Sequence, residues 1–310
     1  MKPIVIIGGG LAGLTLGTAL RQRDIPVSIF EAGHYPRHRV CGEFISGRGR
    51  DVLARLGLED KLFAAGARQA TTAAFFTLRT GGRVTPLPEP ALCVSRHTLD
   101  ALLAAEFRRL GGILHENHRW TGPYLEGALR ATGRRTETAV QGWRWFGLKA
   151  HVRQLPLTAD LEMHLLPHGY VGLCQLSDGT ANVCGLFRTK TPVSDLAQTW
   201  RTWLSGPKDS SLHQRLAPAR FLDDTFCGVG GLSLRPQTAA SHPDCALGDA
   251  ITMIAPLTGN GMSMAFESAE LALETMISYS LGQQDWPVTR ARIAQSCDQA
   301  FARRLRWSHR

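Results

Sequence analysis

The first thirty-one residues carry the pattern that most constrains what this chain can fold into. An apolar run, Ile4–Ile7, predicts a short strand buried on both faces, and residues 11–23 have the pattern of a helix. Between them stands a Gly-x-Gly-x-x-Gly motif, whose members are Gly8, Gly10 and Gly13. A second predicted strand, Val27–Phe30, ends at Glu31, 23 positions after the first glycine. This order is typical of a dinucleotide-binding βαβ unit.

Each part of this unit has a physical task. The glycines allow a tight turn and let a pyrophosphate approach the backbone closely. The N–H groups at the start of the helix, at Leu11 and Ala12, are expected to face the phosphates. The carboxylate of Glu31 is expected to bind the ribose hydroxyls of an adenosine.

The composition excludes several classes of protein. With 44% hydrophobic and 20% charged residues, the 310-residue chain is too apolar to be disordered. It has no run of about 18 apolar residues, so we expect no membrane-spanning helix, and its amino terminus lacks the pattern of a signal peptide. The seven cysteines are odd in number and contain no Cys-x-x-Cys pair. This favours a reducing, cytoplasmic location over a disulfide framework or a zinc knuckle.

We expect no metal site. Ligation by two histidines four residues apart requires a helix, and a proline interrupts both candidate pairs. These pairs are His34 with His38, separated by Pro36, and His164 with His168, separated by Pro167.

The charge of the chain is strongly basic and carried mainly by arginine. The formal net charge is +9, and thirty of the thirty-five basic residues are arginines. Guanidinium groups suit phosphates and carboxylates, so an anionic ligand or surface is one explanation and a general preference for arginine codons is the other. Because the arginines are spread along the chain without interleaved aromatic residues, we expect no nucleic-acid partner.

The pattern along the chain predicts an α/β fold in which a Rossmann-like domain receives an inserted, mostly antiparallel β-sheet domain. Helical patterns recur near residues 46–56, 98–110, 194–204, 262–281 and 289–307. Short alternating stretches occupy 71–92 and 141–235, with a hairpin signal at 177–180. We therefore predict a discontinuous nucleotide-binding domain of residues 1–70, 93–140 and 236–310. The predicted substrate domain comprises residues 71–92 and 141–235.

Further segments resemble one family along nearly the whole chain. They are Arg37–Ser46 with the core Val-Cys-Gly-Glu, Ser95–Asp100, Ala246–Ala250, and Pro256–Met262 with Pro-Leu-Thr-Gly-Asn-Gly-Met. In this order they resemble the group A FAD-dependent oxidoreductases of the p-hydroxybenzoate hydroxylase-like superfamily. This superfamily includes flavin-dependent monooxygenases and halogenases as well as geranylgeranyl reductases.

The resemblance implies FAD as the cofactor and assigns its contacts. The loop with Arg39, Cys41, Gly42 and Glu43 would run beside the flavin ring. Arg96 would reach the phosphate or ribityl region, and Asp249 would hold a ribityl hydroxyl. A further set would present backbone N–H groups to the pyrimidine edge of the flavin at the start of a helix: Pro256, Gly259, Gly261 and Met262. The positive end of that helix would stabilise the negative charge of reduced flavin.

The resemblance also implies the reaction class. NAD(P)H would be a transient co-substrate, since the chain has no second complete dinucleotide motif. The leading interpretation is a monooxygenase acting on an apolar or phenolic small molecule. The alternatives are a reductase of alkenes in an isoprenoid or lipid, and a truncated flavin-binding protein without turnover. Halogenation is not favoured, because no Ile-Pro follows Trp143–Trp145 and no catalytic lysine is evident.

The sequence leaves the catalytic residues unassigned. Cys41 and Tyr170 are candidates, and His151 and His164 lie in the predicted substrate domain. At the carboxyl end, residues 290–310 contain six arginines and a single acidic residue, Asp298. An apolar residue recurs there every four positions, at Ile293, Cys297, Phe301 and Leu305. We expect a terminal helix that either packs on the FAD-binding domain with solvated arginines or contacts an anionic membrane peripherally.

Overall fold

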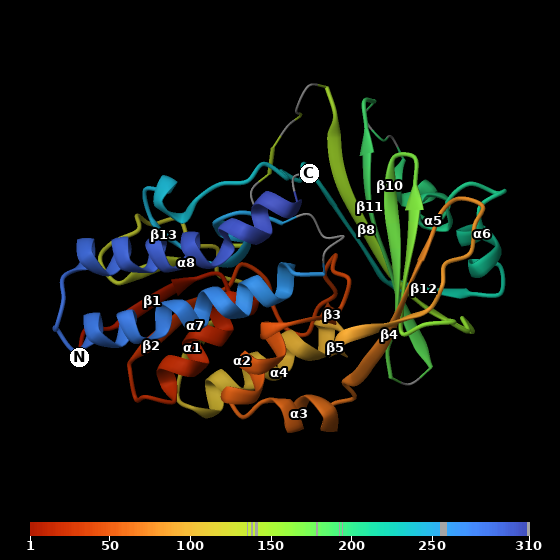
Figure 1. The fold of residues 1–310 in the computed structure, drawn as a ribbon. Helices are drawn as coiled ribbons and strands as arrows, with labels where there is room; N and C mark the ends of the chain where they lie inside the picture. Colours follow the sequence, from red (N-terminus) through yellow and green to blue (C-terminus); the bar gives the residue numbers. More distant parts are fainter. Residues whose placement is uncertain are drawn as a thin grey trace.

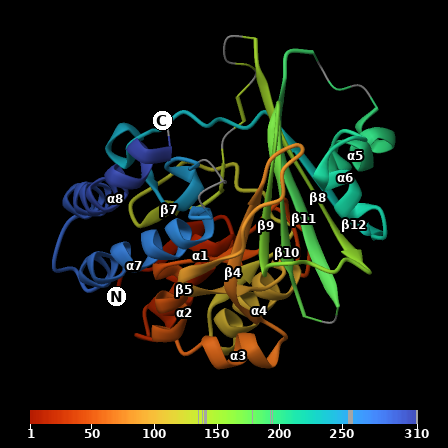
Figure 2. The same cartoon turned by 45° about the vertical axis from the view of Figure 1, so that its right-hand side comes forward.

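The structure of the chain is a computed structural model (Figure 1). The structure describes residues 1–134, 136, 137, 139, 142–177, 179–191, 193, 195–254 and 259–308. Strands of this part of the chain form two sheets, one of five strands and one of eight. The five-stranded sheet lies among the long helices, and the eight-stranded sheet stands beside them with two short helices on its far face (Figures 1 and 2).

The five-stranded sheet is parallel and has the order β13-β7-β1-β2-β6. Its strands are β1 (Ile4–Ile7), β2 (Val27–Phe30), β6 (Ile113–His115), β7 (Ala128–Arg130) and β13 (Cys245–Ala246). The continuous apolar run of β1 suits this central position, where both faces are covered. The predicted Rossmann-like sheet is thereby confirmed.

Helices cover this sheet and bury a single large core. They are α1 (Leu11–Arg21), α2 (Arg48–Arg55), α3 (Glu59–Ala64), α4 (Arg96–Arg109), α7 (Gly261–Ser280) and α8 (Trp286–Ser308), with short 3-10 turns η1 (Ala239–Ser241) and η2 (Gly248–Ala250). Helix α1 packs against both α4 and α7. Gly17 permits this contact, because a Cβ there would lie 2.7 Å from Ile29 and 3.0 Å from Phe107.

The eight-stranded sheet has the order β12-β8-β11-β10-β9-β4-β5-β3. Its strands are β3 (Phe44–Ile45), β4 (Arg68–Phe76), β5 (Thr85–Cys93), β8 (Arg144–Arg153), β9 (Leu161–Leu166), β10 (Gly169–Gln175), β11 (Thr180–Thr189) and β12 (Arg220–Gly230). All pairs are antiparallel except β4 with β9. The expectation of a mostly antiparallel sheet is therefore confirmed.

Strand β8 shows how this sheet separates its two faces. Side chains of a strand alternate between faces, and the even-numbered members of β8 belong to the core beneath α5 (Leu196–Ser205) and α6 (Ser211–Leu216). These buried members are Phe146, Leu148, Ala150 and Val152. The odd-numbered members, which include Lys149 and His151, face the loop of residues 37–43 instead. One face is thus a structural core, and the other is available for chemistry.

The carboxyl-terminal helix packs as the four-residue apolar repeat predicts. Ile293, Cys297 and Phe301 are buried in the core of the first sheet, with Leu305 packed against it. Arg304 forms two hydrogen bonds, of 2.7 and 2.6 Å, to the Glu267 carboxylate on α7. None of the helices described is both long and apolar enough to cross a membrane. The division into two domains at the predicted boundaries stays an interpretation.

Candidate functional site

The glycine motif forms the turn between β1 and α1. Gly8 has a φ of +109°, and a Cβ there would lie 2.3 Å from the carbonyl oxygen of Ala131, so glycine is required. A Cβ on Gly10 would meet nothing closer than 4.0 Å, which leaves its surface open to a ligand. Gly10 is also the N-cap residue of α1 and makes no side-chain cap. The first N–H groups of the helix, at Leu11, Ala12 and Gly13, therefore remain available to an anion.

Glu31 lies at the carboxyl end of β2, beside this turn. One carboxylate oxygen accepts a hydrogen bond of 2.9 Å from the N–H group of Gly9. The other accepts from Gly33 at 2.8 Å and from the Arg37 guanidinium at 2.6 Å. Arg39 is 3.6 Å from the same carboxylate. The sequence motif thus places an acidic residue and two arginines around the start of α1.

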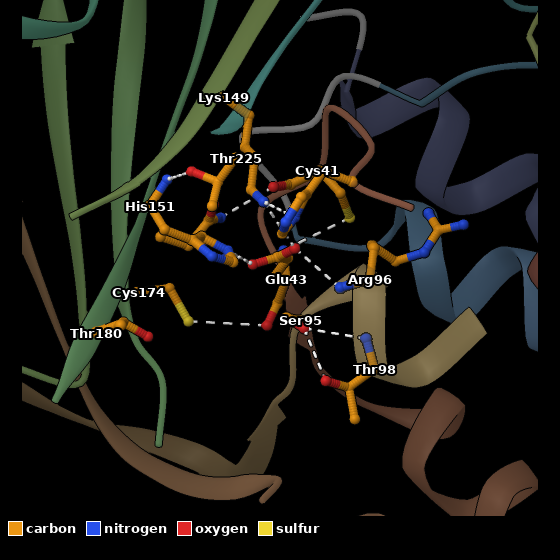
Figure 3. Close-up of polar contacts among 12 residues, drawn as sticks. Cys41, Glu43, Ser95, Arg96, Thr98, Lys149, His151, Cys174, Thr180 and Thr225 are labelled. Carbon is orange, nitrogen blue, oxygen red and sulfur yellow. Dashed lines mark hydrogen bonds and ion pairs between the residues drawn. The ribbon is translucent and has the colours of Figure 1, made fainter. Parts of the chain in front are cut away.

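Arg96 is the first residue of α4, and its guanidinium is already paired. It makes two hydrogen bonds to Asp100, of 2.7 and 2.8 Å, and Asp100 is also 3.3 Å from Arg39. The Arg96 side chain points away from the eight-stranded sheet (Figure 3). Because this ion pair is buried, the guanidinium stays fixed on the side of the first sheet.

Asp249 and the start of α7 complete this side. Asp249 belongs to η2, and burial raises the pKa of its carboxyl above the ordinary value although Arg134 and Arg96 lower it in part. In the described part of the chain its carboxylate has no hydrogen-bond partner. Gly259 has a φ of +65°, whereas Gly261, next to Met262, is the first residue of α7. Residue Pro256 lies outside the described residues.

The two glycines of this loop differ in what their positions require. A glycine at position 261 is not needed for a positive φ, because its φ does not lie in that region and a Cβ there would meet no atom within 4 Å. The same openness holds for Gly42. Both positions therefore leave space for a bound molecule, and only Gly259 requires glycine for its backbone.

Glu43 connects the loop of residues 37–43 to the facing sheet (Figure 3). Its side chain is fully buried, and its φ of 56° is unusual for a residue other than glycine. One carboxylate oxygen accepts from His151 Nε2 at 2.7 Å. The other accepts from the N–H group of Arg96 at 2.8 Å and lies 3.3 Å from Lys149 Nζ. A strained backbone at such a cluster is typical of functional sites.

The charges of this cluster balance one another. Burial alone would raise the pKa of Glu43, but the His151 hydrogen bond and the Lys149 charge outweigh it, so the pKa lies below the ordinary value. Lys149 is fully buried and donates a hydrogen bond of 3.0 Å to His38 Nδ1. Partial burial and the Lys149 charge lower the pKa of His38 to about 4. Near neutral pH, His38 is therefore a neutral acceptor beside an ion pair.

The two candidate catalytic residues named from the sequence lie in different surroundings. Burial raises the pKa of the Cys41 thiol, which therefore is not a ready nucleophile. Burial also raises the pKa of Tyr170, which packs with Leu186 and Met253 on the face of the sheet that carries Lys149. His164 is bound to Glu162 at 3.2 Å and stacks on Phe76, so it belongs to a separate buried cluster.

Three members of the Glu43 cluster do not stand out in the sequence. These members are His38, Lys149 and His151. In the sequence, His38 is noted only in a rejected pair of metal ligands with His34, Lys149 carries no motif, and nothing near His151 indicates that it contacts Glu43. Lys149 and His151 are separated from Glu43 by more than a hundred positions, and only the alternation within β8 signals that they share a face. Within the described residues, His38, Glu43 and His151 also offer ligand atoms within 4.8 Å of one another. The Lys149 ammonium already supplies positive charge at that point.

Comparisons with known proteins agree with this geometry. Residues 1–139 match a family model described as "FAD binding domain". Squalene epoxidase 4 of Arabidopsis thaliana is 34% identical over 87 residues, which are 28% of this chain and 16% of that protein. Squalene epoxidase 5 of the same plant is 37% identical over 68 residues, which are 22% of this chain and 13% of that protein. The matched segments thus span only a small part of these curated relatives.

Solved structures resemble nearly the whole chain. The flavin-dependent brominase Bmp2 has a TM-score of 0.74 at 18% identity, covering 95% of this chain and 83% of Bmp2. The myxobacterial chondrochloren halogenase CndH has a TM-score of 0.75 at 19% identity, covering 98% and 79%. PqsL of P. aeruginosa, in complex with 2-aminobenzoylacetate, has a TM-score of 0.73 at 14% identity, covering 99% and 94%. At these identities the likeness shows the shared fold.

This chain is a flavoprotein: residues 1–139 match an FAD-binding domain, and the chain as a whole shares the fold of flavin-dependent enzymes. The glycine turn and η2 come together from distant parts of the sequence, since a Cβ on Gly248 would lie 3.1 Å from the Cβ of Ala12. The Glu43 cluster of this flavoprotein rests on the contacts among its own residues.

The depressed pKa of His38 makes a prediction about stability. Between about pH 4 and 6.5 the unfolded chain protonates this histidine and the folded flavoprotein does not. The unfolded state then binds more protons, so stability falls as pH decreases through this window. His38→Gln retains an acceptor for Lys149 but cannot titrate. We expect its free energy of unfolding, measured with urea at pH 7 and pH 5, to fall less than that of the wild type.

The control is His34→Gln, at an exposed histidine four positions before His38. It should lose as much stability on acidification as the wild type. An equal loss in His38→Gln and the wild type would contradict the position given to His38.

Proposed function

We propose that this flavoprotein is an FAD-dependent monooxygenase that takes reducing equivalents from NAD(P)H and oxygenates a small organic molecule. One observation carries the proposal: the proposed cofactor site at the start of α1 lies next to a face of the eight-stranded sheet. That face holds the buried Glu43 ion cluster and the apolar cluster around Leu186. The squalene epoxidases among the similar proteins support an oxygen-using reaction.

The residues of the chain fit FAD. Gly10, Gly42 and Gly261 leave open space where a Cβ would otherwise point. The Asp249 carboxylate, without a partner in the described part of the chain, suits a sugar hydroxyl. Nε of Arg37 is buried without a hydrogen-bond partner among the residues described, so it can donate to an anionic ligand. The N–H groups of Leu11, Ala12 and Gly13 suit the diphosphate.

Further contacts to FAD are proposed for the loop and for α7. Glu31 would bind the adenosine ribose, and Arg39 and Arg96 would hold the phosphate and ribityl region. Cys41, Gly42 and Glu43 would flank the flavin ring. The start of α7 would place N–H groups against the ring edge, with the residues Gly259, Gly261 and Met262. Bound FAD would accept a hydride from NAD(P)H and, once reduced, react with O2 to oxygenate the substrate.

The facing sheet would bind the substrate and exclude water. Leu186, Leu232 and Met253 form a buried apolar cluster there, with Tyr170 packed against it. This cluster suits an apolar or aromatic substrate body. Toward the other end of the face, His151 Nε2 donates a hydrogen bond to the Glu43 carboxylate, which leaves Nδ1 as the atom for proton exchange. We propose His151 as the acid–base group, held by Glu43 and Lys149.

The reaction is tested by reducing and reoxidising the purified flavoprotein. We expect the FAD absorbance to bleach on anaerobic addition of NADPH or NADH and to return rapidly with O2, forming hydrogen peroxide when no substrate is present. Bleaching by dithionite controls for bound flavin. Reduction by a nicotinamide without rapid reaction with O2 would overturn the monooxygenase proposal and favour alkene reduction. No bleaching by either nucleotide would leave a flavin-binding protein without turnover.

Cofactor binding is tested at Asp249. Asp249→Ala removes a charge-assisted hydrogen bond to FAD, so the dissociation constant should rise roughly tenfold or more. Flavin fluorescence titration of the FAD-free protein measures this constant. Asp209→Ala is the matched control, because its side chain is 73% exposed and lies in the loop before α6. Equal affinities in the two variants would remove Asp249 from the cofactor site.

We also propose a peripheral membrane contact through α8, for which few basic side chains are available. The apolar stripe of the helix is buried and Arg304 is paired, so only exposed arginines such as Arg303 and Arg306 are available. Each contributes about 1 kcal/mol near an anionic surface and is screened by salt. We expect weak co-sedimentation with phosphatidylserine vesicles at low salt, reduced in an Arg303→Gln, Arg306→Gln double variant. Absence of low-salt binding would contradict this contact.

A further inference from the structure

A cavity of about 230 Å³ lies where the loop of residues 37–43, the start of α4, the end of β8 and the β10–β11 hairpin meet. Its walls include His38, His97, His151 and Arg153. Neither the glycine motif, nor Glu31, nor Asp249 borders it. It is therefore a separate site from the proposed cofactor cradle. Its volume is below the roughly 300–1,000 Å³ of sites that enclose whole drug-sized ligands, so it suits one polar group and its neighbouring atoms.

The walls of this cavity are rich in donors. The donors come from the His38 and His97 imidazoles, the Arg153 guanidinium and hydroxyl groups, among them those of Ser177 and Thr98. No aspartate or glutamate occurs among the described residues that border it. Such a wall attracts a group that accepts hydrogen bonds and carries negative charge.

The acidic group behind the wall does not neutralise the cavity. Glu43 is bound by His151 at 2.7 Å and by the N–H group of Arg96 at 2.8 Å, and it lies 3.3 Å from Lys149. The negative charge of Glu43 is thus matched by Lys149, and its acceptor capacity is taken up. The positive charge of Arg153 has no ion-pair partner within the residues that the structure describes, and its side chain is exposed.

Helix α4 adds a backbone donor at the same place. The Arg96 N–H group donates to Glu43, and the Thr98 N–H group donates to the N-cap residue Ser95 at 3.1 Å. Between them, the N–H group of His97 has no acceptor in the described part of the chain. This helix has 14 residues, and its positive end faces the cavity that His97 borders. Helix end, guanidinium and imidazoles thus converge from different elements.

We infer that this cavity binds an oxyanion, namely the carboxylate or phosphate group of a ligand that lies between the two sheets. The group would accept hydrogen bonds from Arg153 and from the N–H group of His97. His38, neutral near pH 7, would border it without adding charge. The anion site itself does not depend on the proposed reaction. Two sources supply this chemistry in the proposed reaction: a carboxylate on the substrate, or a phosphate of the nicotinamide nucleotide.

Binding to the FAD-loaded flavoprotein is measured by calorimetry with two probes, benzoate and inorganic pyrophosphate, at low and high salt. We expect at least one probe to bind, with an affinity that falls as salt increases. Arg153→Gln should weaken that probe roughly tenfold or more. Arg144→Gln is the matched control, since Arg144 is an exposed arginine at the opposite end of β8 and should change the affinity less than twofold.

Two further measurements separate the sources and the proposals. If Arg153→Gln loses pyrophosphate binding and has a higher KM for NADPH, the site binds the nucleotide phosphate. If Arg153→Gln loses benzoate binding alone, the site binds a carboxylate of the substrate. His97→Gln removes the imidazole but keeps the backbone N–H group, so it should retain most of the affinity for the anion. His97→Pro would remove that N–H group but could unfold the start of α4, so it is not used. If neither probe binds the wild type, or if Arg153→Gln and Arg144→Gln behave alike, the inference is wrong. Flavin reduction by saturating NADPH tests the proposed function separately, and it would persist if only the anion site were absent.

Discussion

The buried ion pair between Glu43 and Lys149 holds together the two halves of this flavoprotein. Removing one partner of such a pair leaves an uncompensated buried charge, at a cost of about 3–5 kcal/mol. Glu43 also accepts hydrogen bonds from α4 and β8, and its backbone carbonyl accepts from the N–H group of Val94 at 3.1 Å. A single residue thereby fixes the loop of residues 37–43 against a helix and a facing sheet. The shape of everything proposed to bind there depends on this loop.

A second group of charges organises the cofactor side. Two buried carboxylates, Glu31 and Asp100, are shared by three guanidiniums from Arg37, Arg39 and Arg96. The group therefore carries one unmatched positive charge next to the start of α1. A diphosphate would complete this balance, since the helix end adds a further partial positive charge. The two charge groups meet at Arg96, whose backbone N–H group donates to Glu43 and whose guanidinium donates to Asp100.

Much of the fold could be predicted from the sequence because its signals are local. The β1–α1–β2 unit follows from an apolar run, three glycines and Glu31 within thirty-one residues, and α7 and α8 follow from long periodic segments. The Glu43 cluster could not be predicted in the same way. His38 and Lys149 are 111 positions apart, and no local pattern states which strand faces the loop. The alternation within β8, with Lys149 and His151 between buried apolar residues, was the one available signal.

The same strand relates the two binding regions of the facing sheet. Trp145, near the start of β8, packs with the apolar cluster around Tyr170, whereas Arg153, at its end, borders the cationic cavity. Eight residues of extended strand span about 26 Å at roughly 3.3 Å per residue. The fully buried Lys149 lies midway between them. A ligand with an apolar body near Tyr170 and an acidic group near Arg153 would have to be long, so a short substrate would occupy only one of these regions.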